Sequence, residues 1–109
     1  MKGTHLGEFE ELVLLVVGIL AGEAYGVSVM DEIEKQVNRK VSVSSIHTTL
    51  TRLEKKGFIE SYTGPASPKR GGRSKRLYRM KGEGQRALEQ VRAHRDQLWN
   101  LLPKLNWSL

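Results

Sequence analysis

Apolar residues recur every three or four positions in the first part of the chain, which is the spacing of an amphipathic helix. The first such segment runs from about Gly7 to Ala21. Its apolar stripe consists of Phe9, Leu12, Val13, Val16, Val17 and Leu20. Leu14, Leu15 and Ile19 lie off that stripe, so the helix is apolar nearly all round and is expected to be buried on more than one side. In a small domain, we interpret the second side as a subunit interface.

Two further helices are predicted before the pattern changes. One runs from about Gly26 to Arg39, and its inner face is expected to carry Val29, Met30, Ile33 and Val37. The next runs from about Ser45 to Lys56, with Ser44 as its N-cap, because a serine hydroxyl can accept a hydrogen bond from a free amide of the first turn. Its narrow apolar stripe consists of Ile46, Leu50 and Leu53. Gly57 fits the left-handed position that ends a helix.

Strand-like sequence follows the third helix. Phe58 to Thr63 and Ser74 to Met80 are predicted strands, and Gly64 to Gly72 is a loop by its glycine and proline content. Two strands around a loop predict a β-hairpin. Three helices followed by a hairpin is the element order of a winged helix-turn-helix, so the fold is expected to be mainly α with a small β-hairpin.

The third predicted helix is the candidate for reading DNA, because the second helix of a helix-turn-helix motif enters the major groove. The candidate contacts are the polar residues at its start and on its outer face: Ser44, Ser45, His47, Thr48, Thr51 and Arg52. Hydroxyls and imidazole can bond base edges, a threonine methyl can contact a thymine methyl, and arginine can read guanine. An ordinary solvated polar face is the alternative interpretation.

The distribution of charge supports nucleic acid as the partner. The chain has a formal net charge of +6, but the segment from Ser61 to Gly82 holds seven of its 18 Lys and Arg residues and none of its 12 acidic ones. This segment is the predicted hairpin, whose candidate DNA contacts are Lys69, Arg70, Arg73, Lys75 and Arg76. Their spacing is compatible with a wing laid along the DNA backbone or into a minor groove. A flexible, solvated run of charge is the alternative.

Other classes of function find little support in the sequence. The chain has no cysteine, its three histidines are dispersed, and it shows neither a phosphate-binding glycine loop nor a Ser/His/Asp signature. We therefore expect no enzyme, no cofactor and no metal site. The longest apolar run, Leu12 to Ala21, is about half the roughly 20 residues that span a bilayer. Without a signal peptide, the protein is expected to be cytoplasmic and to have no membrane partner.

A long terminal helix is expected from Gly82 to Leu102, stopped by Pro103. Apolar positions at alternating spacings of four and three give it a short coiled-coil seam, interrupted by Arg95. Together with the first helix this predicts a homodimer interface formed by Phe9, Leu12, Leu15, Leu88, Val91, Leu98 and Leu102. Packing within one chain is the alternative. The 109 residues are thus expected to form one compact unit, with residues 1–80 binding DNA and residues 81–109 forming the dimerisation helix.

Four blocks of sequence carry a more specific signal. Tyr25-Gly26 stands at the start of the second helix, and Leu50 to Ile59 resembles the pattern Leu-x-Arg-Leu-Glu-x-x-Gly-Leu-Ile. Gly71 to Tyr78 resembles the pattern Gly-Gly-Arg-x-(Arg/Lys)-x-Tyr-Tyr, and Gly84 to Leu88 resembles the start of the last helix in the same set of sequences. In this order and spacing the blocks resemble the PadR-like family of bacterial transcriptional regulators, over nearly the whole chain.

The resemblance implies a homodimeric DNA-binding regulator, usually a repressor, whose C-terminal helix mediates dimerisation. The chain departs from the family at Ile46-His47-Thr48, where Leu-Tyr-Pro is frequent, and at Lys81, where a threonine cap is usual. Some short members hold a planar molecule against a tryptophan of the last helix. The matching position here is about Arg95, and Trp99 one turn later is the candidate for a possible effector pocket.

The function predicted from the sequence is a homodimeric repressor that binds a double-stranded DNA operator and is released by a small-molecule effector. Two recognition helices would enter successive major grooves, roughly 34 Å apart. The alternative is a winged-helix interaction module that docks an acidic protein through its basic wing. Double-stranded RNA is disfavoured, because its deep, narrow major groove does not admit a helix.

Overall fold

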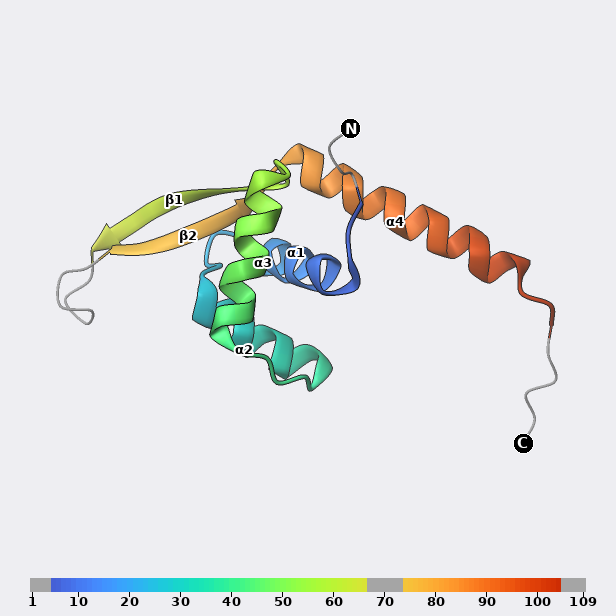
Figure 1. Ribbon diagram of the computed structural model, residues 1–109, viewed down its shortest axis with the longest axis horizontal. Helices are drawn as coiled ribbons and strands as arrows, with labels where there is room; N and C mark the ends of the chain where they lie inside the picture. Colours follow the sequence, from blue (N-terminus) through green and yellow to red (C-terminus); the bar gives the residue numbers. More distant parts are fainter. Residues whose placement is uncertain (1–4, 67–73, 105–109) are drawn as a thin grey trace.

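The computed structural model describes residues 5–66 and 74–104. Its elements, in chain order, are α1 (Glu8–Leu20), α2 (Gly26–Val37), α3 (Val43–Lys55), β1 (Ile59–Ala66), β2 (Ser74–Met80) and α4 (Gly82–Leu101). Helices α1, α2 and α3 pack together, and the hairpin and α4 project from this body on opposite sides (Figure 1). The predicted order of helices and strands, and the mainly helical fold with one hairpin, are confirmed.

Helix α1 contributes one side of the hydrophobic core, against which α2 and α3 pack. Its buried residues are Val13, Leu14, Val16 and Val17. Within the single chain only one broad side of α1 is covered, because Leu15 and Ile19 are exposed. The helix begins with a capping hydrogen bond, in which the amide of Gly7 donates to Glu10 Oε1 at 2.8 Å.

Glu10 also joins α1 to the end of α3. Lys56 Nζ donates to Glu10 Oε1 at 2.8 Å and to the carbonyl of His5 at 2.7 Å. Burial by itself would raise the pKa of Glu10, but hydrogen bonds from Lys56 and the Gly7 amide, and the charges of Lys56 and Arg52, lower that pKa overall. The carboxylate is therefore stabilised in its ionised form.

Helix α2 covers α1 with Val29 and Ile33, which are fully buried, and Met30, which is half-buried. The prediction that Val37 belongs to this inner face is wrong, since its side chain is 51% exposed. Val37 is the last residue of α2, which ends at Asn38 in the left-handed conformation (φ 53°). The apolar periodicity continued by one turn beyond the packed part of the helix.

Helix α3 begins earlier than the sequence suggested. Its N-cap is Ser42, whose hydroxyl accepts a hydrogen bond from the amide of Ser45 at 3.1 Å. The prediction of Ser44 as the cap is wrong, because Ser44 is the second residue of the helix, whereas Ser42 has the extended backbone that a cap requires. The buried stripe of Ile46, Leu50 and Leu53 is confirmed, and Thr49 joins it. Gly57 follows the helix with φ 80°, as predicted.

The hairpin is antiparallel, with Ile59 paired to Met80 and Tyr62 to Leu77. Strand β1 extends to Ala66, three residues beyond the prediction, because the ladder resumes after an irregularity between Thr63 and Ala66 despite the glycine and proline there. On its other edge β2 forms an isolated bridge to Ala24, whose carbonyl accepts from the Tyr78 amide at 2.9 Å. This bridge ties the hairpin to the turn between α1 and α2.

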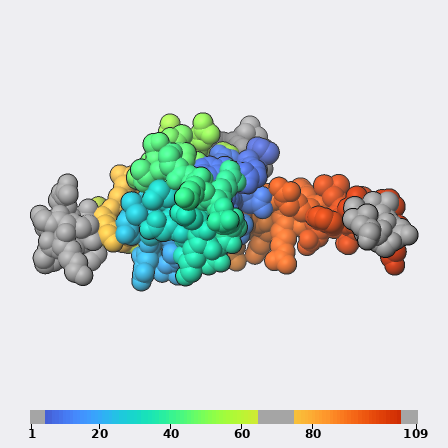
Figure 2. Space-filling view, turned by 90° about the horizontal axis from the view of Figure 1, so that it is seen from below, coloured from blue at the N-terminus to red at the C-terminus, as the bar shows by residue number. Residues whose placement is uncertain are grey.

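Helix α4 is anchored at its start and free at its end. A Cβ built on Gly84 would lie 2.3 Å from the carbonyl oxygen of Phe58, so only glycine permits this approach. Ala87 is buried, and Leu88 and Val91 are half-buried against the core. Farther along, α4 extends away from the helical body (Figure 2). Leu98, Trp99 and Leu101 of α4 and Leu102, which directly follows it, are large apolar residues exposed to solvent. None of the described helices is both long enough and apolar enough to cross a membrane.

Candidate nucleic-acid interface

The outer face of α3 presents the predicted polar residues to solvent. Ser44, His47, Thr48, Thr51 and Arg52 are exposed and Ser45 is half-buried. They are held in place because the opposite face of the helix is locked into the core by three fully buried aliphatic side chains. A rigid helix with such a face can present side chains to a groove at fixed positions.

Local hydrogen bonds decide what the hydroxyl groups of this face can offer. Thr48 Oγ1 donates to the carbonyl of Ser44 at 3.0 Å, and Thr51 Oγ1 donates to that of His47 at 3.0 Å. Ser45 Oγ donates to the carbonyl of Ser42 at 2.8 Å. These hydroxyl protons are already used, so the oxygens are available mainly as acceptors and the threonine methyl groups as apolar contacts.

His47 rests on the beginning of α2. A Cβ on Gly26 would lie 2.7 Å from His47 Nε2 and 2.9 Å from its Cε1, so the imidazole fills the space that a side chain at position 26 would take. This contact gives a physical reason for glycine in the Tyr25-Gly26 motif.

The cations of β2 sit beside α3 and the start of α2. A hollow of about 440 Å³ is lined by His47 of α3, by Tyr25, Gly26 and Val27, and by Lys75 and Arg76 of β2. His47 of α3 and Lys75 and Arg76, near the start of β2, therefore border one hollow. Lys69, Arg70 and Arg73 lie outside the described residues.

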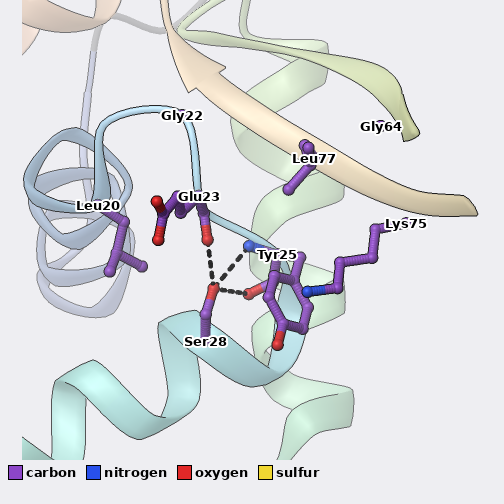
Figure 3. Close-up of a pocket in the computed structure, with 8 residues that line it drawn as sticks. All are labelled: Leu20, Gly22, Glu23, Tyr25, Ser28, Gly64, Lys75 and Leu77. Atoms are coloured by element: carbon purple, nitrogen blue, oxygen red, sulfur yellow. Dashed lines mark hydrogen bonds between the residues drawn. The ribbon is translucent and has the colours of Figure 1, made fainter. Parts of the chain in front are cut away.

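Lys75 reaches over the ring of Tyr25, with its ammonium 3.9 Å from the ring centroid. Figure 3 shows this pair at the rim of a second hollow of about 380 Å³, with Leu20 and Leu77 on its walls. Ser28 Oγ fixes the backbone below by accepting from the Tyr25 amide at 2.8 Å and donating to the Glu23 carbonyl at 2.8 Å. The cation–π contact positions Lys75 but leaves its charge available.

Arg76 is turned toward the C-terminal part of α3. Its Nη2 donates to Ser61 Oγ at 2.9 Å and lies 3.5 Å from Glu54 Oε1. Sequence reasoning counted Arg76 with the other wing cations and gave no role to Tyr25, Ser61 or Glu54. Tyr25 and Glu54 stood within the recognised motifs, which was the available signal, whereas nothing in the sequence marked Ser61.

The residues predicted to form a dimer interface fall into two groups. Phe9, Leu12, Leu88 and Val91 are half-buried and pack against the core of their own chain. Leu15, Leu98 and Leu102 are exposed. Trp99, the candidate effector contact, is 71% exposed and borders a hollow of about 450 Å³ between α1 and α4, together with Leu15, Leu88 and Arg95.

Arg95, which interrupts the predicted seam, has a partner within the chain. Its Nη2 lies 3.3 Å from Glu11 Oε1, so an ion pair links the middle of α4 to α1.

Among the described residues no group of three or more His, Cys, Asp or Glu side chains is arranged to hold a metal ion.

Several solved structures share this fold. A PadR family transcriptional regulator from Eggerthella lenta is 25% identical, with a TM-score of 0.67, over 85% of this chain and 80% of that one. A PadR-like transcriptional regulator from Bacillus cereus is 24% identical, with a TM-score of 0.67, over 89% and 93% of the two chains. PadR of Bacillus subtilis, in a complex with operator DNA, is 17% identical, with a TM-score of 0.63, over 94% of this chain and 52% of that one.

The family comparison is more decisive. No curated protein matches the chain. The model of the family described as transcriptional regulator PadR-like matches residues 13–90, well over half of the sequence. The match includes α2, α3, the hairpin and the anchored part of α4. It confirms the expectation of a regulator rather than an enzyme: the chain belongs to the PadR-like family of transcriptional regulators.

Proposed function

We propose that this protein is a sequence-specific, homodimeric DNA-binding repressor that a small-molecule effector releases from its operator. The observation that carries the DNA-binding part is the single surface bordered by His47 of α3 and by Lys75 and Arg76 of β2. A polar helix face beside a cationic hairpin suits the division of labour in helix-turn-helix proteins, in which phosphate contacts position the protein and base contacts specify the sequence.

In this proposal the outer face of α3 reads bases in the major groove. Ser44, Ser45, Thr48 and Thr51 supply acceptors and methyl groups, His47 a ring nitrogen, and Arg52 a cation. In the wing, Lys69, Arg70, Arg73 and Lys75 hold the DNA backbone. The complex of Bacillus subtilis PadR with operator DNA supports duplex DNA as the ligand.

A second copy of the chain would cover the apolar residues that a monomer exposes. Leu98 and Leu102 are 64% and 52% exposed, and Leu15 and Trp99 border the neighbouring hollow. Exposed leucines at this density on one helix indicate an interaction surface, since monomeric proteins rarely expose large contiguous apolar patches. The half-buried Leu88 and Val91 would continue the interface toward the core.

The hollow beside Trp99 is the proposed place for an effector. An aromatic wall, aliphatic side chains and the charged Arg95 can hold a flat, partly polar molecule. Such a molecule would change the packing of α4, and with it the separation of the two recognition helices. Quenching of Trp99 fluorescence by candidate planar molecules, compared with a Trp99→Phe variant, tests this part separately.

Selection of bound sequences from random duplex DNA tests the central proposal. We expect enrichment of a near-palindromic sequence whose half-sites lie one helical turn apart, about 10 base pairs. Binding no tighter than roughly 10⁻⁴ to 10⁻⁶ M on every duplex at physiological salt would instead favour the interaction module that docks an acidic protein.

The role of the wing can be measured from the dependence of binding on salt. Replacing Arg70 and Arg73 by alanine should flatten the slope of log affinity against log salt by about 0.9 for each lost phosphate contact. The matched control removes two exposed cations, Arg86 and Lys104, from α4 and its C-terminal side. Equal slopes for the two double variants would contradict the wing assignment.

A further inference from the structure

Three polar side chains join α3 to both strands of the hairpin, and we call Glu54, Ser61 and Arg76 the latch. Ser61 Oγ of β1 donates to Glu54 Oε2 at 2.8 Å. Arg76 Nη2 of β2 donates to Ser61 Oγ at 2.9 Å and lies 3.5 Å from Glu54 Oε1. Both oxygens of the Glu54 carboxylate are therefore engaged by the hairpin, one from each strand.

The position of the latch gives it control over the angle between α3 and the wing. Glu54 is the second-last residue of α3 and follows the fully buried Leu53, so its backbone cannot move independently of the core. Arg76 is two residues from Tyr78, where β2 is bridged to Ala24. The latch thus supplies a second attachment of β2 to the helical body, through side chains instead of backbone.

The latch also separates Arg76 from the other wing cations. Lys75, its neighbour in the chain, has no carboxylate partner among the described residues, whereas Arg76 has Glu54. A carboxylate beside a DNA-binding surface repels phosphate, so Glu54 by its charge alone opposes binding. Its presence at the junction of helix and wing is explained if Glu54 holds the hairpin in a fixed orientation relative to α3.

We infer that Glu54 and Arg76 are positioning residues for operator recognition: the latch fixes the wing relative to α3 so that both engage the DNA in one register. The inference rests on the proposed function. It adds a positioning role for Glu54, which has no assigned contact to DNA, and gives Arg76, counted among the wing contacts from the sequence, a positioning role in place of a phosphate contact. For the effect of Glu54 on DNA affinity, this inference predicts the opposite direction from simple charge repulsion. Removing the charge of Glu54 should weaken recognition, although it makes the protein more positive.

The same hairpin offers a matched control. Arg79 Nε of β2 lies 2.7 Å from Glu60 Oε2 of β1, and its guanidinium lies 4.5 Å from the ring centroid of Tyr62. This ion pair also crosses the two strands, but among the described residues neither of its members forms a hydrogen bond or ion pair with α3. Glu60→Gln changes the net charge as Glu54→Gln does, without touching the latch.

The test measures the affinity of each variant for a duplex recovered by the selection and for a scrambled duplex. We expect Glu54→Gln and Arg76→Gln each to lower the ratio of these affinities by roughly three- to tenfold, and the double variant to lower it no further, because coupled residues are not additive. Glu60→Gln should leave the ratio unchanged. Ser61→Ala, a milder change, should act in the same direction as Glu54→Gln.

Three outcomes would overturn the inference. Glu54→Gln could tighten binding or match Glu60→Gln, the effects of Glu54→Gln and Arg76→Gln could add, or Arg76→Gln could flatten the salt slope by about one unit as a phosphate contact does. If the wild-type chain does not prefer the selected duplex, the proposed function falls and the latch inference with it. If it does prefer that duplex, each of the three outcomes refutes the latch alone.

Thermal unfolding of every variant shows whether a loss of affinity reflects misfolding. If Glu54→Gln misfolds, the affinities of Ser61→Ala and of Arg76→Gln, which replaces an exposed side chain, test the latch instead.

Discussion

Replacing Gly84 with alanine tests whether the anchored start of α4 depends on close backbone contact. Alanine is the better helix former by about 1 kcal/mol, so helix propensity alone predicts that Gly84→Ala stabilises the protein. The structure predicts the opposite. The new Cβ would lie 2.3 Å from the Phe58 carbonyl oxygen and 3.1 Å from Met80 Cγ, and real Cβ atoms essentially never approach a neighbour within 3.0 Å.

The cost follows from what has to move. Phe58 O is a main-chain atom that also accepts a hydrogen bond from the Lys81 amide at 2.9 Å, so it cannot swing aside as the end of a side chain could. Overpacking of this kind costs about 1–3 kcal/mol, and contact with backbone places it near the upper limit. After the gain in propensity, Gly84→Ala should lower the free energy of unfolding by about 2 kcal/mol and the melting temperature by about 10 °C.

Gly82→Ala is the matched comparison, since Gly82 lies in the same helix and its Cβ would meet only Arg86 Nη1, at 3.5 Å. We expect this variant to be more stable than the wild type by roughly 0.5 kcal/mol. Thermal and urea unfolding followed by circular dichroism, at one fixed protein concentration, measures both variants. If Gly84→Ala is as stable as Gly82→Ala, the close approach of α4 to Phe58 is refuted.

Three further outcomes are expected. Glu10→Gln should cost roughly 1 kcal/mol at pH 7 and progressively less as the pH falls below 4.5, because the lowered pKa of Glu10 gives a stabilisation that is present above the ordinary value of 4.5 and is lost as the pH falls through the folded-state pKa; urea unfolding across pH checks this, and a cost independent of pH would contradict it. Leu98→Glu with Leu102→Glu should shift the protein toward monomer in sedimentation experiments without reducing the stability of the monomer, since both side chains are exposed. His47→Ala should lower the preference for the selected duplex by about 1–2 kcal/mol without changing the salt slope, as expected for a base contact; an altered slope would show that His47 contacts phosphate.

The course of the chain was predictable wherever periodicity and turn residues agreed. The stripe of α3 and the left-handed Gly57 identified the helix and its end, and both are observed. Failures occurred where the sequence offered equivalent choices. Ser42 and Ser44 are both good caps, and only the path of the backbone into α3 decides between them. Val37 continues an apolar pattern beyond the point at which the core ends.

The candidate site was predictable as a list of residues but not as an arrangement. Composition placed Lys75 and Arg76 in one cationic segment, yet they are neighbours on a strand and have different partners. Periodicity located the outer face of α3 but could not show that the hydroxyl protons of Thr48 and Thr51 are held by backbone carbonyls. Both properties arise from contacts or geometry that a pattern of residue types does not encode.

The bridge between Ala24 and Tyr78 has a mechanical consequence. It is the point at which backbone hydrogen bonding fixes β2 to the helices, so it acts as a fulcrum for the hairpin. Ser74, the first residue of β2 and four residues before Tyr78, lies roughly 14 Å from the bridge at about 3.4 Å per residue. A rotation of about 10° at the fulcrum would therefore displace that end of the strand by roughly 2 Å, enough to break a hydrogen bond with DNA. A small rotation at the Ala24–Tyr78 bridge is thus converted into a larger displacement at the Ser74 end of β2.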